Sequence, residues 1–566
     1  MPKIEVNKNA FFNIFGKNLS QNELVTILEG AKAELDDWND KEGVLKIELN
    51  DTNRPDLWST AGLARQLKLL QGRDDRKYTF FSRQNDFKDH QGREVQVNAG
   101  LKNIRPYVAA FAVKGKPVSE ELLKDTIQTQ EKLCWNYGQK RKSIAMGVYR
   151  ANMIKFPVHY KAVNPDTTSF TPLGLDSELT LGQILKDHPK GQEFGWILKD
   201  VPKFPFLEDA EGGVLSFPPI INSASIGALE VGDDYIFVEM TGLDMDSLLL
   251  ATSIAACDFA DFGYEILPVK IVYPYDTPYG REIVTPYYFQ QPVSMELDYG
   301  RKLLGENLSN EDLLAALKTA GNNVKLDSRK VILTPSEYRN DFLHPVDVVE
   351  EVMIGRGMSS FEAMVPKDFT VGRLSPVELF SRKVRGIMIG LGFQEMIFNY
   401  LGSSKDFIDK MNIENKDFVH IMNPMTENYA VVRKSVLPNL LASESVSANA
   451  VYPHKIFEIG KVACLDKNEN YGALTSNYCS FLLADKDSGF NDVNSLVSAL
   501  FFYLSKDYSL KEKDDPRLIK GRTAEIYYKD KLCGIMGEIH PVVLDNWGIG
   551  MPCSCVELNL DILLEN

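Results

Sequence analysis

Four carboxylates between residues 341 and 351 are the side chains best suited to chemistry. Pro345 suits the first turn of a helix, and Asp347, Glu350 and Glu351 then follow at i, i+3 and i+4, so they share one helix face. Asp341 precedes the helix and can fold back toward them. Close carboxylates repel unless a cation neutralises them. Oxygen ligands without His or Cys suit Mg²⁺ (or Ca²⁺ or Mn²⁺), so the sequence predicts a structural Mg²⁺ site.

A second segment of the chain repeats this region without its acids. Residues 16–36 and 305–327 both begin G-x-N-L-S, have capping-box spacing and continue with leucines at helical intervals. Each is followed by an R-x-D sequence, Arg54 to Asp56 or Arg339 to Asp341, and then by an apolar-periodic helix. The positions equivalent to the four acids are Asp56, Gly62, Arg65 and Gln66. The repeat predicts two related α/β modules, and the difference predicts that the fold does not require the acids.

Two alternatives to a metal site stay open. Acids in the first turn of a helix complement the helix macrodipole without any ion. Arg339 and Arg356 are also close enough in sequence to balance part of the negative charge.

Composition and missing motifs narrow the class of protein. The 566 residues predict about three to five domains, and the net charge of −15 means that any nucleic-acid contact is local or made by a partner. No phosphate loop, G-x-S-x-G elbow or H-E-x-x-H pair occurs. The seven scattered cysteines, the absent signal core and a longest apolar run of only 247–256 predict a cytoplasmic protein that does not enter a membrane.

The segment 235–241 alternates like a β-strand. Tyr235, Phe237, Glu239 and Thr241 fall on one face, and the residues between them fall on the other. The polar pair Glu239 and Thr241 therefore shares a face with aromatic neighbours. It is either part of a binding pocket or the solvent-facing side of an ordinary strand.

Four blocks spread over the chain resemble the β subunit of phenylalanyl-tRNA synthetase in its short archaeal/eukaryotic-type form. They occur in the order typical of that family. The blocks are residues 50–65; 217–223 with 237–244; 336–357; and 423–441 with 455–462 and 537–549.

The resemblance implies a multidomain fold of the α/β and α+β classes. It consists of an N-terminal α/β module, a central editing domain that binds tRNA, a related magnesium-binding α/β module, and a C-terminal class II synthetase-like antiparallel-sheet domain that forms the partner interface. The implied boundaries are 1–92, 93–270, 271–358 and 359–566.

The resemblance also implies an (αβ)₂ tetramer in which the phenylalanyl-tRNA synthetase α subunit activates phenylalanine with ATP and charges tRNA(Phe). The β subunit supplies a scaffold, an Mg²⁺ site and hydrolytic editing of Tyr-tRNA(Phe). The implied Mg²⁺ ligands are the same four acids, Asp341, Asp347, Glu350 and Glu351.

Editing has a physical reason in such an enzyme. A phenylalanine pocket rejects the extra hydroxyl of tyrosine by only about 10², whereas a pocket that hydrogen-bonds the phenol rejects phenylalanine by up to ~10⁴–10⁵. The resemblance places the editing pocket at Leu207, Ser216, Glu239 and Thr241. Glu239 would accept the phenolic proton, Ser216 and Thr241 would lie near the ester or its water, and Leu207 would form an apolar wall.

The C-terminal third lacks the ATP-binding residues of a class II synthetase. Arg433 is followed by Lys434 and Ser435 rather than by a glutamate two residues later, and 548–551 does not continue as G-x-G-x-E-R. A degenerate domain used as a partner interface is therefore expected. Two other functions remain open, namely a non-enzymatic scaffold with an inactive editing site and a free-standing aminoacyl-tRNA deacylase.

Overall fold

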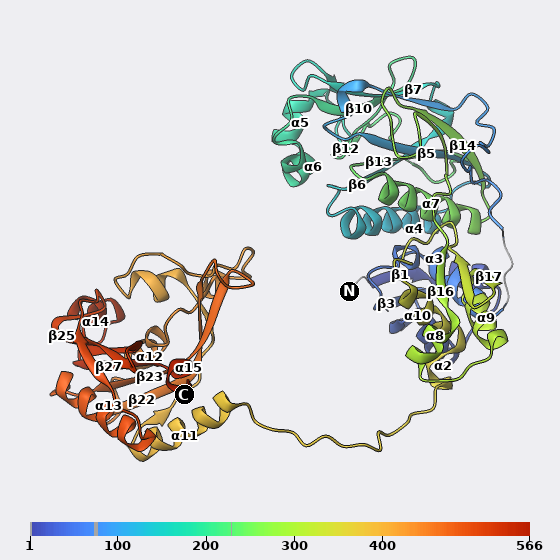
Figure 1. Ribbon diagram of the computed structural model, residues 1–566. Helices are drawn as coiled ribbons and strands as arrows, with labels where there is room; N and C mark the ends of the chain where they lie inside the picture. The colour runs from blue at the N-terminus through green and yellow to red at the C-terminus, as the bar shows by residue number, and fades with distance from the viewer. Residues whose placement is uncertain (1–2, 73–76, 228, 566) are drawn as a thin grey trace. The chain divides into compact units, whose positions relative to one another are not determined.

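The computed structural model describes residues 3–72, 77–227 and 229–565. The chain divides into two compact units, Met1–Met364 and Val365–Asn566 (Figure 1). The first unit contains two three-stranded sheets and one large curved sheet, and the second is built on a seven-stranded sheet. Mixed α/β architecture was expected from the sequence and is confirmed.

The N-terminal module of the first unit packs three helices on a sheet of strand order β1-β3-β2. Helix α2 begins at a capping box formed by Ser20 and Glu23, as its sequence predicts. The elements are β1 (Lys3–Asn7), α1 (Lys8–Phe15), α2 (Gln21–Leu28), β2 (Ala33–Asn39), β3 (Val44–Leu49) and α3 (Thr60–Leu70).

A second module has the same arrangement, with strand order β16-β18-β17. The similarity of the two sequence segments therefore extends to their topology. The elements are β16 (Val293–Glu296), α8 (Leu297–Leu304), α9 (Asn310–Thr319), β17 (Asn323–Asp327), β18 (Lys330–Thr334) and α10 (Pro345–Arg356).

The large sheet between these modules in the sequence has the order β12-β11-β10-β7-β4-β14-β5-β13-β6, with β15 paired to β14. Its strands are β4 (Glu94–Val97), β5 (Tyr107–Lys114), β6 (Ile144–Arg150), β7 (Val158–Val163), β10 (Phe204–Glu208), β11 (Val214–Phe217), β12 (Ile221–Asn222), β13 (Tyr235–Gly242), β14 (Glu265–Val272) and β15 (Glu282–Thr285). The helices of this region are α4 (Glu120–Lys132), α5 (Leu181–Asp187), α6 (Pro189–Phe194) and α7 (Met245–Asp261), and a small hairpin joins β8 (Ser169–Phe170) to β9 (Leu179–Thr180).

The longest apolar run of the sequence, 247–256, lies inside α7, which is buried along most of its length. Helices α4 and α7 lie beside β5, β13 and β6 in Figure 1. Within the described ranges, no helix is long and apolar enough to cross a membrane. All seven cysteines are free thiols, in agreement with the absence of any predicted disulfide.

The second unit contains a sheet of order β19-β22-β23-β27-β26-β25-β24, antiparallel except where β19 joins β22. Its strands are β19 (Gln394–Glu395), β22 (His454–Leu465), β23 (Ala473–Ala484), β24 (Ser509–Glu512), β25 (Leu518–Tyr528), β26 (Lys531–Ile539) and β27 (Cys553–Asn559). The helices are α11 (Pro376–Gly390), α12 (Leu437–Ser445), α13 (Phe490–Leu504), α14 (Pro541–Trp547) and α15 (Leu560–Leu564), and β20 (Leu401–Gly402) pairs with β21 (Val431–Val432).

Candidate functional site

Glu239 occupies the middle of β13, a central strand that pairs with β5 on one side and β6 on the other. Its neighbours in register are Ala110 and Gly147. Only 3% of the Glu239 side chain is exposed. The predicted strand is confirmed, but both of its faces are buried, so the alternative of a solvent-facing strand surface is wrong.

A buried tyrosine joins two of the predicted site residues. The Tyr149 hydroxyl donates to Glu239 Oε1 at 2.7 Å, and it is also hydrogen-bonded to Ser216 Oγ at 2.8 Å. Ser216 lies on β11 opposite Leu207 of β10. Because β11 and β6 are far apart in the strand order, the sheet must curl until these strands face each other. The structure therefore brings Glu239 and Ser216 together, with Leu207 beside Ser216.

The carboxyl group of Glu239 is poised to exchange a proton near neutral pH. Burial raises the pKa of Glu239 to about 7, and the hydrogen bond from Tyr149 and the charge of Arg105 oppose only part of that rise. Its second oxygen, Oε2, is buried without a hydrogen-bond partner. A carboxyl group in this state can accept a proton or a hydrogen bond from a further donor.

Thr241 has a different partner from the other predicted residues. Arg105 Nε donates to Thr241 Oγ1 at 2.9 Å, and Arg105 Nη2 donates to the Thr241 carbonyl at 2.6 Å. Both side chains are buried. Thr241 therefore belongs to a structural contact with Arg105, although it shares the strand face of Glu239.

Sequence reasoning missed Tyr149, Gly147 and Arg105. A Cβ on Gly147 would lie 2.0 Å from the Tyr149 hydroxyl and 2.7 Å from Glu239 Oε1, so only glycine leaves room for this contact. The short apolar run of residues 144–149, with a glycine two positions before the tyrosine, was the available signal. Nothing local indicated that this strand would pair with 235–242.

The four acids predicted to bind Mg²⁺ face different partners. Arg339 holds Asp341 through two hydrogen bonds of 3.0 and 2.5 Å and also binds Glu351 at 2.6 Å. Asp347 accepts from the backbone N–H groups of residues 343 and 344 as part of the cap of α10. Glu350 forms an ion pair with Lys32 of the N-terminal module. The charge balance by Arg339 that the sequence left open is thus present.

The N-terminal module repeats half of this arrangement. Arg54 holds Asp56 through two hydrogen bonds of 2.8 Å and reaches Gln66 at 2.8 Å. These three residues are the counterparts of Arg339, Asp341 and Glu351. The Arg–Asp pair therefore belongs to the fold of both modules, which corrects the expectation that none of the acids is required by the fold.

This arrangement does not present the four carboxylates to one ion. Asn322 Nδ2 donates to Glu351 Oε2 at 2.6 Å, so both oxygens of that carboxylate have partners. In the part of the chain that the structure describes, no group of three or more His, Cys, Asp or Glu side chains is disposed to hold a metal ion.

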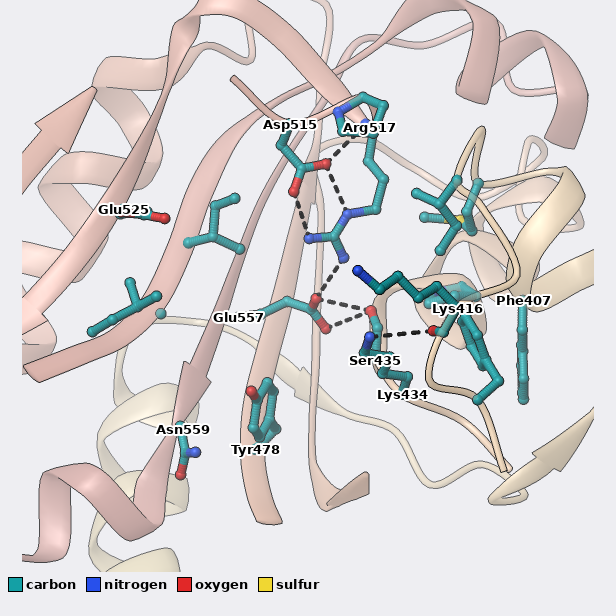
Figure 2. A pocket seen from close by; sticks show the side chains of 18 of the residues that line it. Phe407, Lys416, Lys434, Ser435, Tyr478, Asp515, Arg517, Glu525, Glu557 and Asn559 are labelled. Atoms are coloured by element: carbon teal, nitrogen blue, oxygen red, sulfur yellow. Dashed lines mark hydrogen bonds and ion pairs between the residues drawn. The ribbon is translucent and has the colours of Figure 1, made fainter. Parts of the chain in front are cut away.

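The second unit contains a cavity of about 530 Å³ against its sheet. Figure 2 shows Arg517 between Asp515 and Glu557, with Tyr478 and Phe407 among the other lining side chains. Glu557 accepts from Arg517 Nη1 at 3.1 Å, from the Ser435 hydroxyl at 2.8 Å, and from the backbone N–H groups of residues 436 and 437. These donors resemble those of an anion site at a helix N-terminus, and a carboxylate of the protein already fills it.

Arg433, which directly precedes the cavity-lining residues Lys434 and Ser435, is also unavailable to a phosphate. It is fully buried, and it donates to both oxygens of Glu458 at 2.8 and 2.9 Å. The Arg433 carbonyl and side chain further bind residues of β22. The Arg433 guanidinium is therefore occupied by Glu458 and not aimed at the cavity.

Three family models match the chain. The Phe-tRNA synthetase beta subunit B1 domain matches residues 1–73, the tRNA synthetase B5 domain matches 293–358, and the phenylalanyl tRNA synthetase beta chain CLM domain matches 362–560. The B1 and B5 matches coincide with the two small modules, and the CLM match covers nearly all of the second unit.

Curated relatives match over the whole length. The phenylalanine–tRNA ligase beta subunit of Borreliella burgdorferi (strain ZS7) is 50% identical over 567 residues, and that of Borrelia hermsii (strain HS1 / DAH) is 48% identical over 568, each covering 100% of both chains. The crystal structure of an N-terminal fragment of the phenylalanyl-tRNA synthetase beta-subunit from Pyrococcus horikoshii is 35% identical, with a TM-score of 0.58 over 62% of this chain and 99% of that one.

These relatives qualify the resemblance drawn from the sequence. The two curated relatives are bacterial, so they do not support the archaeal/eukaryotic-type assignment, although the archaeal fragment matches the first unit. A sequence identity of 50% over the full length of both chains establishes the family. The chain belongs to the family of phenylalanine–tRNA ligase β subunits.

Proposed function

We propose that this chain is the β subunit of a heteromeric phenylalanine–tRNA ligase that attaches phenylalanine to tRNA(Phe) with ATP. The observation that carries the proposal is 50% identity to such a subunit over both full lengths. The α subunit supplies the aminoacylation site, in keeping with the filled anion site at Glu557 and the buried Arg433. The proposed assembly is an (αβ)₂ tetramer in the cytoplasm. The full coverage of relatives of about the same length favours a short form of the subunit.

We also propose that the central region edits Tyr-tRNA(Phe). Its support is the buried group of Glu239, Ser216 and Tyr149, in which Glu239 already accepts a hydrogen bond from a phenol. A carboxylate in this position distinguishes tyrosine from phenylalanine, because phenylalanine leaves a buried acceptor unpaired. A water molecule would attack the ester, and the carboxyl group of Glu239 would hold the side chain in place.

A measurement of editing activity distinguishes the main proposal from the alternative of a scaffold subunit with an inactive editing site. The assembled enzyme, incubated with Tyr-tRNA(Phe), is expected to release tyrosine well above the uncatalysed rate, and Glu239→Ala is expected to lose that release while charging phenylalanine normally. Equal rates with and without enzyme would favour the scaffold. Purification from native extract tests the free-standing deacylase, since that alternative requires a chain without a stoichiometric α subunit.

The Mg²⁺ site at Asp341, Asp347, Glu350 and Glu351 remains a prediction. Binding there requires Glu350 to leave Lys32 and Glu351 to leave Arg339. Equilibrium dialysis with Mg²⁺ is expected to show one ion fewer per chain for Glu350→Gln than for the exposed control Glu362→Gln. Equal Mg²⁺ binding by the two variants would contradict the prediction that these acids bind Mg²⁺.

A further inference from the structure

The space beside the Glu239 carboxylate is already filled by the protein's own phenol. The Tyr149 side chain is fully buried, and its hydroxyl contacts both Glu239 and Ser216. The hydroxyl lies where the missing side chain of Gly147 leaves room. These contacts are the ones that a site for tyrosine must offer, namely a carboxylate acceptor, a hydroxyl and space for an aromatic ring.

The ring of Tyr149 is held by a further aromatic contact. Its centroid lies 6.1 Å from that of Phe237, and Phe156 packs edge-on against Phe237 at 5.7 Å. The hydrogen bonding of Glu239 is nevertheless incomplete, because Oε2 is buried without a partner. The protein therefore supplies one phenol to a carboxylate that has capacity for another donor. Because Glu239 and Tyr149 are both buried, a second phenol can take the same position only if Tyr149 moves.

From this geometry we infer that Tyr149 is the resident occupant of a phenol site, and that a tyrosyl group on tRNA binds Glu239 only after displacing it. The inference rests on the proposed editing function and adds a gate to it. Tyr149 competes with the substrate for Glu239, so it lowers the rate of editing and excludes side chains that cannot replace its hydrogen bond. A tyrosyl group restores that bond, whereas a phenylalanyl group does not.

Removing the phenolic hydroxyl tests the competition directly. Tyr149→Phe keeps the ring but loses the hydrogen bond to a carboxylate, so kcat/KM for release of tyrosine from Tyr-tRNA(Phe) is expected to rise about tenfold in the assembled enzyme. A merely structural role predicts the opposite sign. The matched control is Tyr273→Phe, which removes another buried hydroxyl whose bond, to the Val108 carbonyl, lies elsewhere; its rate is expected to be unchanged.

The kinetic outcomes decide between the two proposals. If the wild type edits and a folded Tyr149→Phe is no faster, the gate is wrong and editing stands. If the wild type is inactive and Tyr149→Phe edits, the gate is supported as a complete block. If neither releases tyrosine, the editing proposal fails, and the binding measurement below alone decides whether the phenol site exists.

Small aromatic probes test the site without tRNA. Tyr149→Ala removes a group the size of phenol, and calorimetry on the full chain is expected to show phenol binding at least tenfold tighter than benzene. The double variant Tyr149→Ala/Glu239→Gln is expected to lose most of that preference, and the wild type is expected to bind neither probe. Equal affinity of Tyr149→Ala for the two probes, or no binding, overturns the phenol site. Should Tyr149→Ala not fold, the sign of the Tyr149→Phe effect decides.

Discussion

At the scale of single residues, Glu239 is a buried carboxyl group whose pKa is raised well above that of an ordinary glutamate. An ionised carboxylate is costly to bury, and here Arg105 is the cation whose charge acts on it, through a guanidinium that is bonded to Thr241. The folded protein therefore holds a proton on Glu239 more tightly than the unfolded chain does. Its carboxyl group can therefore change charge near pH 7, a property that is common among functional groups of binding and catalytic sites.

The titration of Glu239 predicts a pH dependence of local stability. Since its pKa rises from 4.5 to about 7 on folding, the native state binds more protons between these values, and stability falls as the pH rises through this window and levels off above it. The loss attributable to Glu239 is about 3 kcal/mol. Hydrogen exchange of residues 235–242 is expected to show this decline in the wild type and not in Glu239→Gln.

The control for this prediction is Glu265→Gln, an exposed glutamate on β14, which β5 separates from β13 in the same sheet. It is expected to retain the decline of the wild type. A Glu239→Gln variant whose exchange follows the wild-type pH profile would show that Glu239 is ionised in the folded protein throughout this range.

The close approach at Gly147 predicts a second effect. In Gly147→Ala the new methyl group would collide with the Tyr149 hydroxyl and Glu239 Oε1, and relieving such overpacking typically costs about 1–3 kcal/mol. We expect a lower unfolding temperature for the first unit and loss of editing. Gly182→Ala is the matched control, because its nearest neighbour would lie at 3.4 Å, an ordinary contact. An unchanged unfolding temperature in Gly147→Ala would contradict the geometry.

Residue-level prediction succeeded where the signal was local. The alternation of residues 235–241 placed Glu239 and Thr241 correctly on one strand face. Their different partners depend on Tyr149, Ser216 and Arg105, which come from strands and loops far along the chain. The register between β13 and β6 follows from packing of the whole sheet, so no window of sequence contains it.

At the scale of elements, the two small modules share one arrangement of side chains. In each, an arginine two residues before an aspartate holds that aspartate, and then reaches a residue of the following helix, Gln66 in α3 or Glu351 in α10. The two arginines are neighbours in space, since Arg54 lies 3.9 Å from Glu351. The repeated sequence predicted both modules, but it could not show that they meet at these side chains.

Arg339 is expected to be essential for this contact. Burial acts to raise the pKa of Asp341, but the charge and hydrogen bonds of Arg339 outweigh it and the net shift is downward. Arg339→Ala removes the cation that hydrogen-bonds both Asp341 and Glu351 and leaves them only the more distant Arg54. Removing one partner of a buried ion pair typically costs about 3–5 kcal/mol. Chemical unfolding followed by hydrogen exchange in α10 measures the loss.

Two further variants make this prediction specific. Arg329→Ala removes an exposed arginine from the same module and is expected to be neutral within about 0.5 kcal/mol. Adding Asp341→Asn to Arg339→Ala is expected to restore part of the stability, because one uncompensated charge is removed. Equal stability of Arg339→Ala and Arg329→Ala would contradict an essential role.

At the scale of the whole molecule, the second unit carries many exposed apolar side chains. Such side chains on a soluble protein mark interaction surfaces when they gather into patches. The most exposed include Phe369, Ile397, Met422, Met425, Val446, Val451 and Phe502. In the same unit, Glu557 fills the anion site in the cavity. The features of this unit therefore favour binding of a partner at its surface over binding of a nucleotide against its sheet.

This division of labour predicts that the purified chain alone does not activate phenylalanine. A nucleotide in the cavity of the second unit would have to displace Glu557 from Arg517, Ser435 and the start of α12, leaving a buried carboxylate with the Ser480 hydroxyl as its remaining partner and no cation. ATP–pyrophosphate exchange with phenylalanine is therefore expected at background for the chain alone and at full rate after addition of the α subunit. Arg517→Ala, which removes the cation paired with Glu557, is expected to weaken the fold of the second unit without abolishing exchange per assembled complex. Exchange by the isolated chain, or its specific loss in assembled Arg517→Ala enzyme, would place adenylate chemistry in this subunit and overturn the assignment.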